Sequence, residues 1–143
     1  MTRKEEKDLL LKYLCMALPY EVKVLYDNNV FDIDYISPLY EEVKLDIANN
    51  YTISISEVKP YLRTLASMTE DELSELSNII SECWDKELFT LTEEPMIEFA
   101  LSRLKYSINP MLFNWLLEHH FDFLDLIPKN LAIEVTKENN PYN

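Results

Sequence analysis

Glycine is missing from this chain altogether: Gly occurs 0 times in 143 residues. Glycine is needed where the backbone approaches a phosphate closely or turns with positive φ, as in the P-loop, the GxGxxG dinucleotide turn and the GxSxG elbow of hydrolases. Its absence therefore argues against the common nucleotide-binding and hydrolase chemistries.

Cysteine and long apolar runs are also scarce. Cys15 and Cys83 each lie in an apolar helical pattern without CxxC spacing, which is typical of reduced core thiols in a cytoplasm. No apolar run approaches the ~20 residues of a membrane helix, and the opening T-R-K-E-E-K-D lacks the apolar core of an export signal. We therefore expect a cytoplasmic protein that does not contact membranes.

Basic residues are few, with Lys+Arg 13 against Asp+Glu 26 and a net charge of -13. A surface of this charge repels the phosphates that a nucleic-acid binder must neutralise, so direct binding of DNA or RNA is not expected. The negative charge is also concentrated in one segment, because ten acidic residues accompany Lys86 alone between Met68 and Glu98.

The chain does contain enough apolar material for one core. Because 48% of its 143 residues are hydrophobic, the range 1–143 is predicted to be a single domain. Residues 4–18 have apolar side chains at helical spacing before Pro19 ends the run. Residues 22–35 and 43–55 instead alternate apolar and polar side chains, with the period of 2 that is typical of strands.

The first alternating stretch predicts a β-hairpin that turns on asparagine. Pairing Tyr26 with Phe31 keeps the apolar side chains on one face and leaves two asparagines, 28–29, as the loop. Two-residue loops favour the type I′ turn, in which both residues take positive φ and Asn is the best substitute for Gly. Asparagine therefore replaces glycine in this turn.

The second hairpin needs a longer loop. Its apolar residues stay in phase only when Ile47 faces Tyr51, which leaves the three residues 48–50 between the strands. Such a loop commonly ends in a left-handed residue at a bulge, and Asn50 stands at that place. The two hairpins together predict a four-stranded antiparallel meander at about 20–58 with one apolar face.

Helices are expected after the meander. The sequence T-E-D-E at 69–72 matches a capping box and begins a helix that should run to about Leu88. Two further helices are predicted to begin at Thr92 and Asn109. A short helix capped by Asp122 and an edge strand from Leu131 are predicted to follow them. The predicted fold class is α+β: an N-terminal helix, the meander, and a C-terminal bundle of three to four helices packed on the sheet.

Four acidic residues form the main candidate site for a partner. Asp71, Glu75, Glu82 and Asp85 have spacings that place them on one side of the helix, opposite its apolar side chains. Such a ridge has two interpretations, a solvated outer face or a surface of one charge sign that steers a basic partner. No catalytic, cofactor-binding or metal-binding residue is predicted.

A metal site at His119, His120 and Asp122 is the weakest alternative. Adjacent histidines on a helix point about 100° apart, so they cannot hold one ion as an i, i+4 pair does. A helix end that carries histidines and is followed by an Asp cap explains the same residues without a metal.

Three segments, at the two ends and in the middle of the chain, resemble segments of other proteins. They are L-P-Y-E-V-K-V at 18–24, P-Y-L-R-T-L-A-S-M-T-E-D-E at 60–72, and W-L-L-E-H-H-F-D-F-L-D-L-I-P-K-N-L-A-I-E at 115–134. These blocks resemble small uncharacterised proteins of gut Bacteroides-type bacteria and their bacteriophages or prophages, in which glycine stands at the positions of Glu21, Leu124 or its neighbour, and Asn130. The resemblance implies a phage or prophage accessory protein in the cytoplasm of a bacterial host.

Together, these observations predict a non-enzymatic protein without a cofactor, whose acidic surface recognises a basic protein. Imitation of a nucleic acid is a role that such a surface could serve, and the resemblance to phage proteins implies inhibition of a host defence as another. One alternative is a structural or assembly component of a phage, which would form a homo-oligomer through the tyrosine-rich sheet. The other is a metal-dependent enzyme that uses His119, His120 and Asp122.

Overall fold

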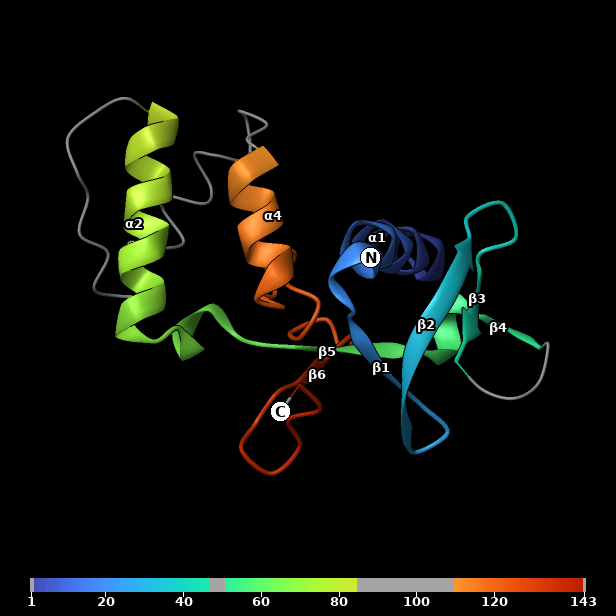
Figure 1. Ribbon diagram of the computed structural model, residues 1–143. Helices are drawn as coiled ribbons and strands as arrows, with labels where there is room; N and C mark the ends of the chain where they lie inside the picture. Colours follow the sequence, from blue (N-terminus) through green and yellow to red (C-terminus); the bar gives the residue numbers. More distant parts are fainter. Residues whose placement is uncertain (1, 47–50, 85–109, 143) are drawn as a thin grey trace.

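The computed structural model describes residues 2–46, 51–84 and 110–142, and within helix α2 it describes side chains as far as Ile79. These residues form an α+β fold with an N-terminal helix, a mixed sheet and further helices (Figure 1). The helices are α1 (Arg3–Ala17), α2 (Glu70–Trp84) and α4 (Pro110–Glu118), with short 3-10 helices at Leu18–Tyr20, Ile55–Glu57 and Leu65–Ser67. The strands are β1 (Lys23–Tyr26), β2 (Asn29–Ser37), β3 (Glu42–Leu45), β4 (Thr52–Ser54), β5 (Lys59–Leu62) and β6 (Ile133–Glu134).

The sheet is larger than the predicted four-stranded meander. Its described strands have the order β4-β3-β2-β1-β5-β6, so β1 to β4 are neighbours in sequence order, as expected. Strand β5 then pairs antiparallel with β1, and β6 pairs in parallel with β5. Strand β5 is not among the predicted strands, and it contains Pro60, which has no N–H to donate to a neighbouring strand. The edge strand expected after Leu131 is confirmed as β6.

The first hairpin has the predicted faces but a different register. Tyr26 pairs with Asn29 and Val24 with Phe31, so the turn falls on Asp27 and Asn28, whose φ angles are 48° and 62°. Two consecutive positive φ angles fit the expected I′-type geometry, one residue earlier in the chain. The partner of each residue of β1 has moved by two positions, which leaves the side chains of β1 and of residues 29–32 of β2 on their predicted faces.

An irregularity in β2 changes which residues face the core. Ile33 pairs with Leu45, but Tyr35 pairs with Lys44, so β2 holds one extra residue at this point. The extra residue moves Ile36 to the core side, whereas Tyr35 is half exposed. The expectation that Tyr35 lies on the apolar face is therefore wrong.

The second hairpin also has a shifted register. Val43 pairs with Ile53, two positions from the predicted partner. Ile55 was expected at the end of the strand but lies in a 3-10 helix, where it is fully buried. The predicted loop residues 48–50 lie outside the described residues.

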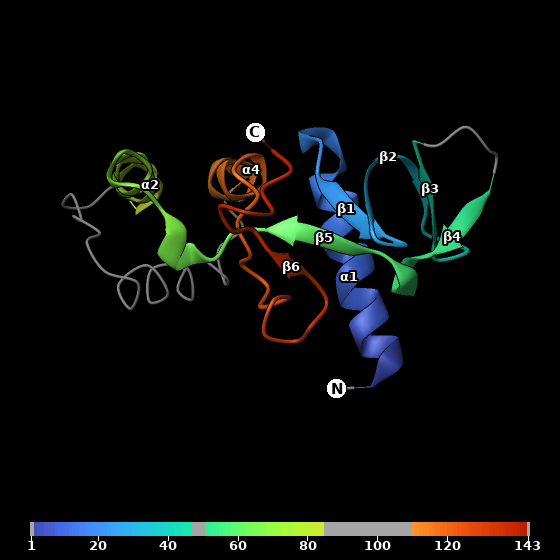
Figure 2. The same ribbon diagram turned by 90° about the horizontal axis from the view of Figure 1, so that it is seen from below.

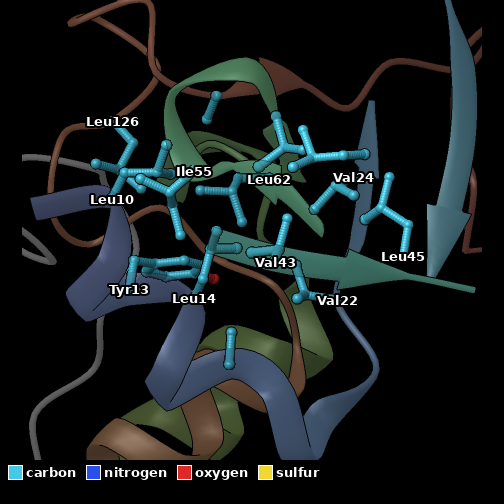
Figure 3. Close-up of a cluster of buried hydrophobic side chains, with 14 of the residues drawn as sticks. Leu10, Tyr13, Leu14, Val22, Val24, Val43, Leu45, Ile55, Leu62 and Leu126 are labelled. Atoms are coloured by element: carbon cyan, nitrogen blue, oxygen red, sulfur yellow. The ribbon is translucent and has the colours of Figure 1, made fainter. Parts of the chain in front are cut away.

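Helix α1 covers one face of the sheet (Figure 2). Its buried side chains are Leu10, Tyr13, Leu14 and Ala17, and Figure 3 shows the first three of them among apolar side chains of the strands. This spacing of 3, 4 and 7 follows one side of an α-helix. Cys15 falls outside that side and is exposed, so its assignment as a core thiol is wrong.

The two described C-terminal helices, α2 and α4, do not form a bundle over the sheet. In the described part of the chain, α2 and α4 pack together beyond the end of β5 (Figures 1 and 2). Their shared apolar cluster contains Leu76, Leu112, Trp115, Leu116 and Phe121. Helix α4 begins at Pro110 as predicted, and the helix predicted from Thr92 lies outside the described residues.

Left-handed backbone occurs at several places despite the absence of glycine. The described residues with positive φ are Glu21, Asp27, Asn28, Glu41, His120, Asp125 and Asn130. Asn and Asp tolerate this conformation better than other residues with a Cβ atom. At Glu21, Asp125 and Asn130 the φ angles are 57°, 58° and 59°, which is backbone that glycine adopts without steric cost.

Candidate functional site

Helix α2 begins with a dense group of carboxylates. Thr69 caps the helix: its hydroxyl group accepts from the Glu72 N–H at 3.2 Å, and the Glu72 carboxylate accepts from the Thr69 N–H at 2.9 Å. The predicted capping box is therefore confirmed. Glu70 and Asp71 also lie in the first turn, where the positive end of the helix dipole stabilises acidic side chains. Between residues 70 and 84 the sequence has five acidic residues and no Lys or Arg.

Glu72 does not belong to the free surface of the helix. Its two carboxylate oxygens each accept a 2.7 Å hydrogen bond from the guanidinium group of Arg63. These side chains are only 13% and 22% exposed. The hydrogen bonds from Arg63 are the main reason why the pKa of Glu72 is lowered to about 2. Glu72 therefore fastens the start of α2 to the chain segment that follows β5.

Arg63 also contacts the aromatic ring of Phe121. Its guanidinium carbon lies 4.3 Å from the centre of the Phe121 ring, a distance suited to a cation–π contact. The Phe121 ring stacks in turn on Trp115, with 5.7 Å between centroids and 20° between planes. The backbone of Arg63 is held as well, since its N–H donates to the His120 carbonyl oxygen at 2.8 Å. A continuous set of contacts thus connects α2, α4 and β5.

Glu75 makes the second connection between α2 and α4. One of its carboxylate oxygens accepts a 3.0 Å hydrogen bond from the Trp115 indole N–H. The same oxygen lies 3.9 Å from Nε2 of His119, whose ring packs on Trp115. The Glu75 side chain is nevertheless 57% exposed. Glu75 therefore positions α2 and also contributes negative charge to the surface.

The predicted acidic ridge is described only in part. Asp71 and Glu75 are both exposed on α2, whereas the side chains of Glu82 and Asp85 lie outside the described residues. Glu70 is exposed beside Asp71, and sequence reasoning missed it because its position does not share the ridge spacing. We call Glu70, Asp71 and Glu75 the acidic face.

The structure separates the three residues of the metal hypothesis into different environments. His119 packs on Trp115. The His120 ring instead stacks on Tyr142, with 3.8 Å between the ring centroids and 10° between the ring planes. The Asp122 carboxylate is buried and accepts hydrogen bonds from the backbone N–H groups of Leu126 and Ile127, at 2.9 and 2.8 Å. Asp122 thus closes a turn, and the short helix predicted after it is absent from this described segment. Among the residues that the structure describes, no group of three or more His, Cys, Asp or Glu side chains is placed to hold a metal ion.

Two polar groups that the sequence does not predict to be buried, on Tyr13 and His120, lie inside the protein. The hydroxyl group of Tyr13 and Nδ1 of His120 are buried without a hydrogen-bond partner among the described residues. Burial is the main reason why the pKa of His120 is lowered to about 4 and the pKa of Tyr13 is raised. Tyr142 covers His120, and the tail sequence N-N-P-Y-N gives no signal that its tyrosine is largely buried.

Compared with known protein families, curated protein sequences and solved structures, the chain matches none. Within the described ranges, no helix has both the length and the apolar character needed to cross a lipid bilayer.

Proposed function

We propose that this protein is a non-enzymatic accessory protein that binds a basic protein through the acidic face of α2. The observation that carries the proposal is the arrangement of Glu70, Asp71 and Glu75, three exposed acidic residues on a helix without a single cation. A surface of one charge sign attracts a partner of the opposite sign and accelerates their encounter.

The way in which the helix is fixed supports this role. The Arg63–Glu72 pair holds the first turn, and the Trp115–Glu75 hydrogen bond holds the second turn. A rigid surface loses less conformational freedom on binding than a mobile one. The acidic face is therefore preorganised for a partner, and its helix stands at one end of the described structure (Figure 1).

The resemblance to phage and prophage proteins suggests the partner class. Carboxylates in a row on a helix imitate the repeated negative charge of a nucleic-acid backbone, and a nucleic-acid-binding protein of the host presents the matching basic surface. We therefore propose a nucleic-acid-binding host protein, such as a component of a defence system, as the partner.

The experiment compares two triple variants with the same net charge. The first, Glu70→Gln, Asp71→Asn and Glu75→Gln, removes the charge of the acidic face, and the amide oxygen of Gln at 75 can still accept from Trp115. The matched control, Glu57→Gln, Glu134→Gln and Glu138→Gln, removes three exposed charges outside α2. Each immobilised protein is incubated with host lysate at low and at high salt.

The proposal requires that the native chain and the control retain a basic protein at low salt and release it at high salt. The first variant should fail to retain this protein at either salt concentration. Retention of the same proteins by both triple variants would contradict it. In that case the acidic face serves only to keep the helix surface solvated.

Assembly is the second candidate function, and exposed apolar residues on the sheet side favour it. Leu39, Tyr40 and Tyr51 are 83%, 71% and 73% exposed. Exposed tyrosines are common anchors of protein interfaces. Light scattering on the purified chain tests this candidate: a closed oligomer that a Leu39→Ser and Tyr40→Ser variant converts to monomer would favour assembly, and a monomeric native chain would exclude it.

A further inference from the structure

A hollow of about 720 Å³ lies at the start of α1, away from the acidic face. Its walls come from four separate parts of the chain: the first turns of α1, Glu41 in the turn between β2 and β3, residues 56–59, and the turn at Asn130. Small-molecule sites commonly have volumes of roughly 300–1,000 Å³. The hollow is thus large enough for a ligand of metabolite size.

Cations gather around this hollow. Arg3, Lys4, Lys7 and Lys59 all line it, although the whole chain has only 13 Lys and Arg residues and a net charge of -13. In a protein with so few cations, four around one hollow make a local surface whose sign is opposite to that of the molecule. An anion is the ligand that such a surface attracts.

Two of the four cations already have a partner. Lys7 forms a 3.0 Å ion pair with Glu41, and Nζ of Lys59 donates to Oδ1 of Asn130 at 3.1 Å. The amide of Asn130 carries no charge, so the charge of Lys59 is not neutralised there.

For the other two cations, Arg3 and Lys4, no ion pair occurs within the described ranges, and both side chains are exposed. Glu6 also lines the hollow, and it is the acidic residue there that has no described ion pair. Arg3, Lys4 and Lys59 together outweigh this one carboxylate, so the hollow retains a net positive charge.

The hollow also has an apolar part. Leu10, Val58 and Leu131 line it, but Leu10 and Val58 are only 2% and 0% exposed, so the half-buried Leu131 is the aliphatic side chain that a bound molecule can reach. A hollow lined by cations and by one accessible aliphatic side chain fits a molecule with an anionic group at one end and an apolar body at the other.

We propose that this hollow binds a small organic anion, with Arg3, Lys4 and Lys59 contacting its phosphate or carboxylate group and Leu131 contacting its apolar body. The site is separate from the acidic face, so its ligand and the protein partner bind independently.

Titration of the full chain with small molecules, followed by NMR at low salt, tests the site. Phenyl phosphate and phthalate provide the same aromatic body with a phosphate or with carboxylates, and inorganic phosphate provides the anion alone. We expect saturable shifts of the backbone resonances of residues 3–10 and 56–59 with phenyl phosphate or phthalate. The better of the two identifies the anion, and inorganic phosphate should bind more weakly because it lacks an apolar body. Shifts that never saturate, or that spread over all surface lysines, would overturn the proposal.

A pair of variants with equal charge tests the role of the cations. Arg3→Gln with Lys4→Gln should weaken binding at least tenfold, which corresponds to about 1.4 kcal/mol, because the variant removes two cations that contact the anion. The control, Lys12→Gln with Lys137→Gln, removes two exposed cations elsewhere and should change affinity less than about twofold. Equal losses in both variants would mean that only the net charge matters, and the site would be rejected.

The two proposals can fail separately. The variant that lacks the charges of Glu70, Asp71 and Glu75 should bind phenyl phosphate as the native chain does, even when it no longer retains a basic partner.

Discussion

The hydroxyl group of Tyr142 donates a 2.7 Å hydrogen bond to the backbone carbonyl oxygen of Tyr61, 81 residues earlier in the chain. The same hydroxyl group accepts a 3.1 Å hydrogen bond from the backbone N–H of Lys23. Lys23 belongs to β1 and Tyr61 to β5, and these strands pair directly only at Val24 and Leu25. A side chain from the tail therefore takes the place of the next hydrogen bonds between the strands.

Tyr142→Phe should destabilise the fold. The variant keeps the ring stacked on His120 but leaves a backbone N–H and a carbonyl oxygen without their partner, and we expect a loss of about 2 kcal/mol in the free energy of unfolding. Urea denaturation measures it. The matched control is Tyr40→Phe, since Tyr40 is highly exposed and should lose almost nothing. A similar loss in both variants would show that the bridge does not stabilise the fold.

Glu72 should make the fold sensitive to acid. Its pKa is about 2 in the folded chain, against an ordinary value of 4.5, so the folded state favours the ionised carboxylate. The stabilisation is present above pH ~4.5 and is lost as the pH falls toward ~2, by about 2–3 kcal/mol in total. Glu72→Gln should flatten the unfolding free energy in this pH range, whereas Glu134→Gln should not. An unchanged acid slope in Glu72→Gln would contradict the role of the Arg63 pair.

His120 should make the stability of the fold depend on pH in a higher range than Glu72 does. Its pKa is about 4 in the folded chain, against an ordinary 6.5, because burial disfavours the charged ring. Between these values the unfolded chain binds more protons than the folded chain, so stability should decrease as the pH falls from ~6.5 to ~4. NMR titration of the His120 ring checks the pKa directly. A midpoint near 6.5 would mean that the ring is not buried against Tyr142 in solution.

Glu21→Gly should stabilise the protein. Glu21 has φ 57° and ψ 46°, a left-handed conformation in which the Cβ atom is crowded, and its side chain is exposed. Removing the Cβ atom should raise the unfolding free energy by about 1 kcal/mol. Glu21→Ala is the control, because it removes the same charge and keeps the Cβ atom. Equal stabilities of the Gly and Ala variants, measured by urea denaturation, would show that the backbone at this position is not strained.

The sequence predicts the faces of the strands better than their partners. A slip of two residues changes no side chain's face, so the hydrophobic pattern cannot distinguish Tyr26 opposite Asn29 from Tyr26 opposite Phe31. Local turn chemistry decides instead, and the side-chain amide of Asn29 donates to the Asp27 carbonyl oxygen at 3.0 Å. The helix starts at Thr69 and Pro110 were predictable because caps depend on adjacent residues.

The contacts of the candidate site were much less predictable. Asp71 and Glu75 follow from helical spacing alone, and both are exposed as a ridge requires. The hydrogen bond from Trp115 to Glu75 joins residues 40 positions apart, and the pair of Arg63 with Glu72 depends on how β5 leads into α2. No local pattern encodes such distances, so the double role of Glu75 emerges only from the fold.

The described apolar side chains form two clusters, one between α1 and the sheet and one between α2 and α4. Phe123 packs against both. Parts of a protein that pack around separate clusters can open separately, each with its own free energy. Hydrogen exchange of the backbone amides of α2 and of β1 to β3 should therefore report two different opening free energies. A partner on α2 would slow exchange at that end alone, so the binding surface and the sheet respond to a ligand as separate cooperative units.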